Sequence, residues 1–227
     1  MKTFGKQAID FFQQVELNIN IQGIEVMNPY KKPEIFNLTA TFFKKFYDDH
    51  HSRTFIFGIN PGRFGAGQTG IAFTDPINLA EECKIQNNLP QRHELSSQFI
   101  YKVITEYGGV EQFYKKFYIT SLSPLGFTKD GKNLNYYDLQ ILKEAVYPFI
   151  VESTRKQFYF GANPHKAICV GGDKNFKFLT QLNSSLKLFK KIIPLEHPRY
   201  IMQYKRREID WFSKKYLNTL KNCELNT

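Results

Sequence analysis

The sequence is poor in the residues that build metal centres and disulfide frameworks. Its 227 residues include three cysteines, Cys83, Cys169 and Cys223, with no CxxC pair and no histidine cluster at metal-ligand spacing. This distribution argues against a zinc or iron–sulfur site, and the odd number of cysteines suits a reducing compartment. We therefore expect neither a metal nor a cofactor.

Long apolar runs are missing as well. No segment approaches the length of a membrane span, and residues 1–14 lack the apolar core of a signal peptide. Internal repeats, low-complexity tracts and linkers are also lacking. These absences predict a soluble, cytoplasmic monomer with no membrane partner, made of one domain over residues 1–227.

Aromatic side chains and positive charge are what the sequence has in excess. It contains 22 phenylalanines and 13 tyrosines, enough for a large core, and 31 basic against 21 acidic residues give a net charge of +10. The natural partner of such a surface is a polyanion such as DNA. A basic surface that serves only solubility is the alternative.

Hydrophobic spacing predicts an alternation of strands and helices. Short apolar runs at residues 54–59, 117–120, 167–170 and 191–195 indicate buried strands, each followed by polar or glycine-rich residues. Helical spacing occurs at residues 4–15, 35–46, 96–107, 135–152, 173–182 and 204–220. The pattern predicts a three-layer α/β/α fold around a central, mainly parallel four-stranded sheet, with the N-terminal helices of residues 1–50 packed on it.

Some local details follow from the same spacing. Asn135 is predicted to cap its helix, and Gly108 to end the helix before it. Trp211 and Phe212 are both assigned to the buried side of the last helix. Because open α/β sheets bind ligands at the carboxyl ends of their strands, the residues after the four strands are predicted to rim one crevice: Asn60, Ser121, Gly171 and His197.

The most informative segment is residues 57–73, FGINPGRFGAGQTGIAF. It has glycines at 58, 62, 65 and 67, which allow the backbone to approach a ligand closely. Their order fits neither GxGxxG nor GxxxxGK[ST], so a nucleotide-cofactor loop is disfavoured.

This segment resembles the water-activating motif of the single-strand-selective monofunctional uracil-DNA glycosylases, a branch of the uracil-DNA glycosylase superfamily. Residues 121–125 (SLSPL), 131–134 (GKNL) and 195–198 (LEHP) resemble, in the same order, the base-recognition strand end, a following loop and the histidine-proline DNA-intercalation motif. The resemblance spans about residues 54–200. It implies a monofunctional DNA glycosylase of base excision repair, whose partner is DNA containing uracil or other deaminated bases and whose product is an abasic site.

The resemblance also implies roles for single residues. Asn60 would hold the hydrolytic water, His197 would donate to the carbonyl oxygen of the leaving base, and Phe73 would stack on the flipped base. Read without the resemblance, the three could be a turn residue, a histidine bonded to backbone and a core phenylalanine. The implied base-binding set is completed by Gly58, Ile59, Gly62, Phe64, Ser121 and Ser123.

Two pocket positions depart from the family pattern. At Gly62 the most uracil-selective members are expected to carry a bulky tyrosine, so glycine implies a roomier pocket. At Ser121 an asparagine is expected, and a serine hydroxyl is shorter and can rotate to donate or accept. The serine predicts looser base discrimination that admits deaminated purines such as xanthine, with Ser123 and backbone amides sharing the recognition of the base.

The loop after His197 departs from the family as well, because Arg199 and Tyr200 occupy the place of an expected serine-proline. Either could fill the gap left by a flipped base, and Arg199 could instead bind a phosphate. The other implied DNA contacts are Gly67, Gln68, Lys132, Asn133, Gly171 and Lys205. No lysine lies where a Schiff-base nucleophile would be needed, so strand cleavage is not expected.

Other functions remain open at this point. The chain could be a catalytically weak binder of damaged or single-stranded DNA, a glycosylase whose main substrate is xanthine or hydroxymethyluracil, or a hydrolase of free nucleosides.

Overall fold

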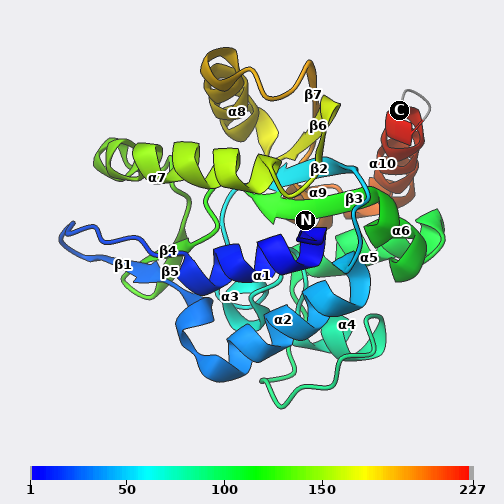
Figure 1. Cartoon of the computed structure of the whole chain (residues 1–227), viewed down its shortest axis with the longest axis horizontal. Coiled ribbons are helices and arrows are strands. Elements are labelled where there is room, and N and C mark those ends of the chain that lie inside the picture. Colours follow the sequence, from blue (N-terminus) through cyan, green and yellow to red (C-terminus); the bar gives the residue numbers. More distant parts are fainter. Residues whose placement is uncertain (1, 225–227) are drawn as a thin grey trace.

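A four-stranded sheet lies at the centre of the computed structural model, which describes residues 2–224. Its order is β3-β2-β6-β7 and all neighbouring pairs are parallel. The strands are β2 (Arg53–Gly58), β3 (Phe117–Ser121), β6 (Ala162–Val170) and β7 (Lys191–Leu195). Helices cover both faces (Figure 1), so the predicted three-layer α/β/α fold is confirmed.

The helices account for most of the remaining chain. They are α1 (Phe4–Gln14), α2 (Pro33–Tyr47), α3 (Ala66–Thr69), α4 (Pro76–Glu81), α5 (Leu95–Tyr107), α6 (Val110–Lys116), α7 (Gln140–Phe158), α8 (Gly172–Leu186), α9 (Pro198–Tyr204) and α10 (Ile209–Glu224), with 3-10 turns η1 (Pro29–Lys31) and η2 (Arg206–Glu208). Within residues 2–224, no helix has the length and apolar character needed to cross a membrane.

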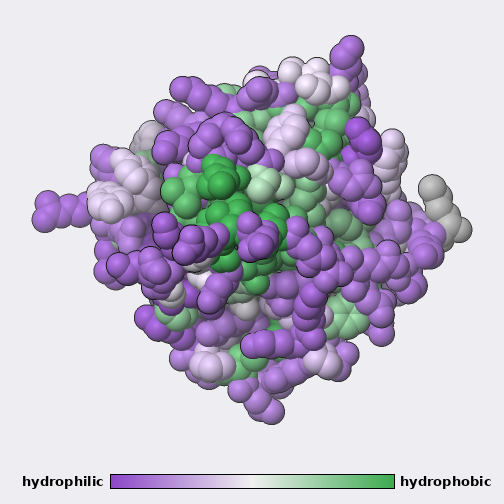
Figure 2. Space-filling model, turned by 90° about the vertical axis from the view of Figure 1, so that its left-hand side faces the viewer, coloured by the Kyte–Doolittle hydropathy of each residue, from purple (hydrophilic) through white to green (hydrophobic). Residues whose placement is uncertain are grey.

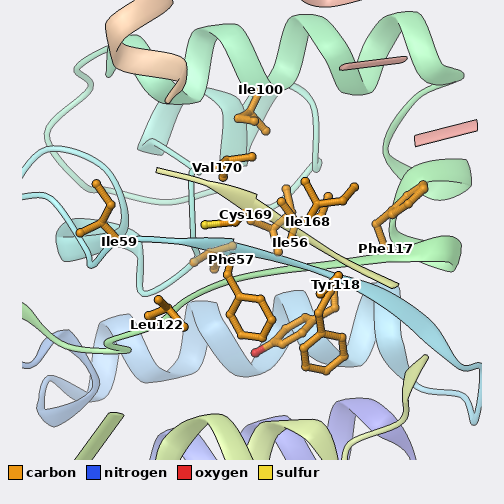
Figure 3. Close-up of a cluster of buried hydrophobic side chains, with 14 of the residues drawn as sticks. Ile56, Phe57, Ile59, Ile100, Phe117, Tyr118, Leu122, Ile168, Cys169 and Val170 are labelled. Carbon is orange, nitrogen blue, oxygen red and sulfur yellow. The ribbon is translucent and has the colours of Figure 1, made fainter. Parts of the chain in front are cut away.

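The two faces of the sheet bury different kinds of side chain, because successive residues of a strand point to opposite sides. Phe55 and Phe57 of β2 face the layer of α1, α2 and α7, where Phe55 meets the rings of Phe4 and Tyr118. Ile56, between them, lies on the opposite face, which α5 covers (Figure 3). Every position of the two strands β2 and β3 is buried, as continuous apolar runs predict for a parallel sheet.

A second, antiparallel sheet in the order β1-β4-β5 was not predicted. It consists of β1 (Ile24–Met27), β4 (Gly126–Lys129) and β5 (Lys132–Leu134). The turn between β4 and β5 has positive φ at Asp130 and Gly131, the backbone conformation of a tight hairpin. Residues 131–134, expected as a loop, thus form a hairpin arm, which lies against the segment after β2.

The helix predicted for residues 135–152 has a different start. Asn135 is not its N-cap, because α7 begins at Gln140 and follows Leu139. The backbone N–H of Asn135 instead donates to the carboxylate of Asp138, which closes a turn between β5 and the helix. Gly108, in contrast, ends α5 as predicted, with a φ of 126°.

The long helix predicted for residues 204–220 is divided into α9, η2 and α10. Phe212 is buried as expected, but Trp211 is 58% exposed, so its assignment to the buried side was wrong. Neighbouring helical residues point about 100° apart, and the stripe that faces the protein contains Phe212, Tyr216 and Leu220. Trp211 lies outside that stripe.

Candidate active site

A cavity of about 300 Å³ opens at the carboxyl ends of β2, β3 and β7. Asn60, Ser121 and His197 all line it, as the strand pattern predicts. Gly171, the fourth predicted rim residue, does not: it is buried at the start of α8, where a Cβ would lie 2.5 Å from Asn175. Figure 2 views the side toward which these strand ends point, and shows an apolar patch among hydrophilic side chains.

The cavity also collects most of the other residues singled out from the sequence. Besides the three strand-end residues, its predicted members are Ile59, Gly62, Phe64, Phe73, Asn133 and Arg199. They come from the segment after β2, the β4–β5 hairpin and the start of α9, three regions that are far apart in sequence.

The side-chain amide of Asn60 is held in one orientation. Its Nδ2 donates to the carbonyl oxygen of Leu134 at 3.1 Å, and its Oδ1 accepts from the backbone N–H of Tyr136 at 3.0 Å. A carbonyl partner on one side and an N–H partner on the other define which end of the amide is oxygen. The oxygen keeps a second lone pair that can accept a hydrogen bond from a water molecule.

His197 is fixed as a neutral donor. Its Nδ1 accepts from the backbone N–H of Arg199 at 3.1 Å and caps α9, so the proton of the neutral ring must be on Nε2. The pKa of His197 is lowered from 6.5 to about 4, mainly by burial and in smaller part by the positive charge of Arg199. At neutral pH the cavity therefore contains an uncharged imidazole with one N–H to donate.

Phe73 adopts a backbone conformation that is rare for an aromatic residue, with a φ of 53°. Its ring lies on Gly58, where an added Cβ would come within 2.7 Å of it, and 6.0 Å from the ring of His197 between centroids. Gly58 does not line the cavity itself but leaves the space that the ring of Phe73 occupies. The end of β2 thus presents an aromatic face to the cavity.

The two serines after β3 differ in their contacts. The Ser121 hydroxyl faces the cavity and has no hydrogen-bond partner among residues 2–224. Ser123 is fully buried outside the cavity, and its hydroxyl donates to the carbonyl oxygen of Leu125 at 2.7 Å. Only Ser121 is therefore available to a ligand through its side chain.

Gly62 adds room to the cavity. A Cβ at this position would meet only the Asn133 side chain, at 3.4 Å. Asn133 in turn accepts a hydrogen bond from the backbone N–H of Arg63 at 3.1 Å, which ties the β4–β5 hairpin to the segment after β2.

Several predicted DNA contacts lie outside the cavity. Gly67 packs closely on Met27, where a Cβ would lie 2.6 Å from the sulfur, so its glycine has a structural reason. Gln68 follows it in α3 and is half-buried, Lys132 is exposed on β5, Tyr200 is 44% exposed on α9, and Lys205 pairs with Glu208.

One wall of the cavity was not predicted from the sequence and is formed by the segment that leads into α5. The lining residues it contributes are Arg92, His93, Glu94, Leu95 and Ser96; Asn135, beyond β5, was also missed. Glu94 is the one carboxylate in the lining, and it caps α5 through Ser97 N and also binds the Ser96 hydroxyl. Because this segment follows no strand, the rule that located the other residues does not reach it.

Metal ligands are not gathered in this site. Within residues 2–224, no group of three or more histidine, cysteine, aspartate or glutamate side chains could hold a metal ion. The cavity instead combines an amide (Asn60) and an imidazole (His197), each held by hydrogen bonds to backbone groups, with an aromatic ring and the two arginines Arg92 and Arg199.

A cavity at the carboxyl edge of a parallel sheet is where open α/β folds generally bind their ligands. The family model of the Uracil DNA glycosylase superfamily matches residues 44–221, and the chain belongs to that superfamily. Over 100% of both chains it is also similar to the crystal structure of wild-type Pedobacter heparinus SMUG2, with 44% sequence identity and a TM-score of 0.95. No curated protein matches the chain.

This full-length similarity confirms the branch that the sequence motifs indicated. The protein is thus a uracil-DNA glycosylase-like protein of base excision repair that acts on DNA.

Proposed function

We propose that this protein is a monofunctional glycosylase that hydrolyses the N-glycosidic bond of uracil, and of other deaminated bases, in DNA and leaves an abasic site. The observation that carries the proposal is the meeting of two fixed groups in one cavity: the amide of Asn60 and the imidazole of His197. The cavity volume of about 300 Å³ lies at the lower end of the range for small-molecule sites and is large enough for a flipped base.

In the proposed complex the flipped base stacks on Phe73. Its ring projects into the cavity above Gly58, and stacking suits any base because every base has a π-face. The unusual φ of Phe73 supports this role, since strained backbone is retained mainly where the surrounding structure enforces it for function.

Asn60 then positions the nucleophile. Its Oδ1 accepts from a water molecule, whose oxygen forms a bond to the anomeric carbon of deoxyribose as the bond to the base nitrogen breaks. The sugar acquires oxocarbenium character, so orientation of the water contributes more than strong base catalysis. The hydrogen bonds of Asn60 to Leu134 and Tyr136 hold the amide in place before the substrate arrives.

His197 stabilises the leaving group. The electron pair of the broken bond passes to the base, whose negative charge spreads to a carbonyl oxygen, and the Nε2–H of His197 donates to that oxygen. A neutral imidazole is enough for this task, in keeping with a pKa lowered by burial to about 4.

Substrate range in this proposal follows from Ser121 and Gly62. The free hydroxyl of Ser121 can donate to one base and accept from another, and Gly62 puts no side chain into the cavity. We infer that xanthine and five-substituted uracils are accepted besides uracil. Ser121→Ala should lower the rate of uracil excision by roughly tenfold, the cost of one hydrogen bond in the transition state, and unchanged uracil excision would contradict the assignment.

DNA contacts outside the cavity are proposed for α9. Tyr200 is exposed, and its ring lies 5.6 Å from that of Tyr204, which supports it from one side. We assign to Tyr200 the filling of the gap that the flipped base leaves, and to Arg199, at the cavity itself, a contact with the phosphate backbone.

The decisive experiment compares Asn60→Ala with the wild type on labelled oligonucleotides that carry uracil, xanthine, hypoxanthine or hydroxymethyluracil. Abasic products are revealed by alkaline cleavage. We expect the single-turnover rate to fall by about a hundredfold to a thousandfold, the usual cost of losing a group that acts in the transition state, while binding persists.

Glu94→Gln is the comparison variant, because Glu94 contributes a carboxylate to the cavity lining and a carboxylate could act as the base that activates water. If Glu94→Gln abolished excision and Asn60→Ala did not, the assignment of Asn60 would be wrong. A wild type that binds these oligonucleotides and excises nothing would instead identify a binding protein, and excision from free deoxyuridine alone a nucleoside hydrolase.

A further inference from the structure

Two arginines meet on one aromatic ring beside the cavity. The guanidinium carbon of Arg92 lies 3.9 Å from the centre of the Phe64 ring, and that of Arg63 lies 4.8 Å from it. Phe64 and Arg92 line the cavity. The pair joins two segments that are distant in sequence, the glycine-rich stretch after β2 and the loop before α5.

Neither guanidinium group has a partner of opposite charge. Within residues 2–224, no carboxylate pairs with the side chain of Arg63 or Arg92, and the buried Nε of Arg63 has no hydrogen-bond partner at all. Bringing two unpaired cations to one ring costs electrostatic free energy, and the cation–π contacts offset only part of it. An anion that the two guanidinium groups contact would reduce that cost.

The loop that carries Arg92 is held in place by polar contacts. The Asn87 side chain donates to the carbonyl oxygen of Pro76 at 2.9 Å, and the buried carboxylate of Asp75 accepts from the backbone N–H of Glu94 at 3.0 Å. The loop is therefore anchored on both sides of Arg92.

We propose that Arg63 and Arg92, stacked on Phe64, bind a backbone phosphate of the substrate strand next to the flipped nucleotide. The proposal rests on the proposed function for the identity of the substrate, but not for the presence of an anion site. A guanidinium that is stacked through its flat face keeps its N–H edge free, and that edge matches two phosphate oxygens.

The position of the stack favours a phosphate over other ligands. The base has to enter the cavity, so its own sugar and the two phosphates beside it remain at the mouth. Arg92 and Arg199 both line the cavity and are exposed to solvent. Arg199 comes from the start of α9, and Arg92 from the loop before α5. The two arginines can thus hold the strand on either side of the flipped nucleotide.

The first test measures binding of Arg92→Gln and Arg63→Gln to an undamaged single-stranded oligonucleotide at several salt concentrations. Each variant should bind roughly tenfold to a hundredfold more weakly, as expected for the loss of a hydrogen bond to a charged group. The slope of log affinity against log salt should fall by about 0.7, the value for one phosphate contact on a single strand.

Arg155→Gln is the matched control. Arg155 is an exposed arginine in the last turn of α7, for which no carboxylate partner is found within residues 2–224. The Arg155→Gln variant loses the same charge, but its affinity for the oligonucleotide and its salt slope should stay close to those of the wild type. Arg92→Lys should restore the salt slope, because it restores the charge without the planar fork.

The second test locates the phosphate by replacing one linkage at a time with a neutral methylphosphonate on either side of a uracil. At the linkage that Arg92 contacts, the replacement should weaken binding by the wild type and have little further effect on Arg92→Gln. At other linkages, the loss of affinity caused by the neutral linkage and the loss caused by Arg92→Gln should be independent, so the two fold-changes multiply. Multiplication at every linkage, or an Arg92→Gln salt slope equal to that of the wild type, would overturn the proposal.

The alternative occupant of the stack is a neighbouring base that displaces Arg92 from Phe64. In that case Phe64→Leu would reduce affinity far more than Arg92→Gln, and the salt slope would not change, so the phosphate site would be rejected. Since the first test uses undamaged DNA, a protein that binds it as expected but excises no base from uracil-containing DNA would refute the proposed function and leave the phosphate site standing.

Discussion

Two regions of this molecule use aromatic residues in opposite ways. Beneath the sheet, Phe4, Tyr47, Phe55 and Tyr118 form a closed layer in which each ring is met by others at centroid distances of 4.8–6.1 Å. At the carboxyl edge of the sheet, Phe73 leaves one part of its ring exposed to a cavity.

The two regions differ in whether their polar groups have hydrogen-bond or ionic partners within the protein. In the aromatic layer even a fully buried arginine has partners, because Arg53 forms an ion pair with Asp49 and stacks on Phe4. The cavity keeps polar groups unused, among them the Ser121 hydroxyl and the guanidinium of Arg92. Groups left without partners in a folded protein are those that a ligand can satisfy, so the first region is expected to determine stability and the second activity.

The largest effect should come from Phe4→Ala in the aromatic layer. Truncation of a fully buried phenylalanine leaves a cavity and costs about 3–5 kcal/mol of unfolding free energy. Denaturant unfolding would measure it, with Phe4→Leu as the conservative control at a smaller cost. If residues 1–50 share one domain with the sheet, as we propose, unfolding stays a single transition. A separate early transition for α1 and α2 would refute that organisation.

Gly58→Ala should show an intermediate effect that links the two regions. The added methyl group would lie 2.7 Å from the Phe73 ring and displace it, at a cost of about 1–3 kcal/mol for an overpacked site. We expect weaker binding of uracil-containing DNA and slower excision with little change in fold. Combining it with Phe73→Ala tests the mechanism, because the second substitution removes the clash; independent effects would show that the ring does not transmit the change.

The smallest effect concerns pH. The pKa of His197 in the folded protein, about 4, lies below its ordinary value of 6.5, so unfolding takes up a proton between these values. The contribution of this group to stability is complete above pH 6.5 and is lost as the pH falls toward 4. His197→Asn should therefore lose less thermal stability than the wild type between pH 6.5 and 4.5.

The same pKa predicts how excision depends on pH. A neutral His197 persists down to about pH 5, so the single-turnover rate of the wild type should be flat from pH 8 to 5 as far as this group is concerned. An acidic limb centred near pH 6.5 that disappears in His197→Asn would contradict the neutral-donor assignment.

The strand ends show how far prediction from sequence reached. The sequence alone predicts that Asn60, Ser121 and His197 share one cavity, because parallel strands end at one edge of a sheet and the polar residues after each strand can be recognised locally. The same rule predicted that Gly171 lines the cavity, and this was wrong, because α8 begins directly after β6 and Gly171 is buried there. The rule finds the edge of the sheet but not which loop faces the cavity.

Only the tertiary structure revealed the wall that contains Arg92. Its segment reaches the cavity because hydrogen bonds of Asp75 and Asn87 hold a loop that has no strand pattern. Such hydrogen bonds between distant residues produce no periodic pattern in the sequence. The tautomer of His197 was equally hidden, because it depends on a backbone N–H that comes into place when α9 starts.

Local spacing along the chain is enough to predict the class of fold, the positions of the four central strands and the order of the motifs. The folded chain decided which polar groups keep free hydrogen-bonding capacity, since that depends on neighbours contributed by distant segments.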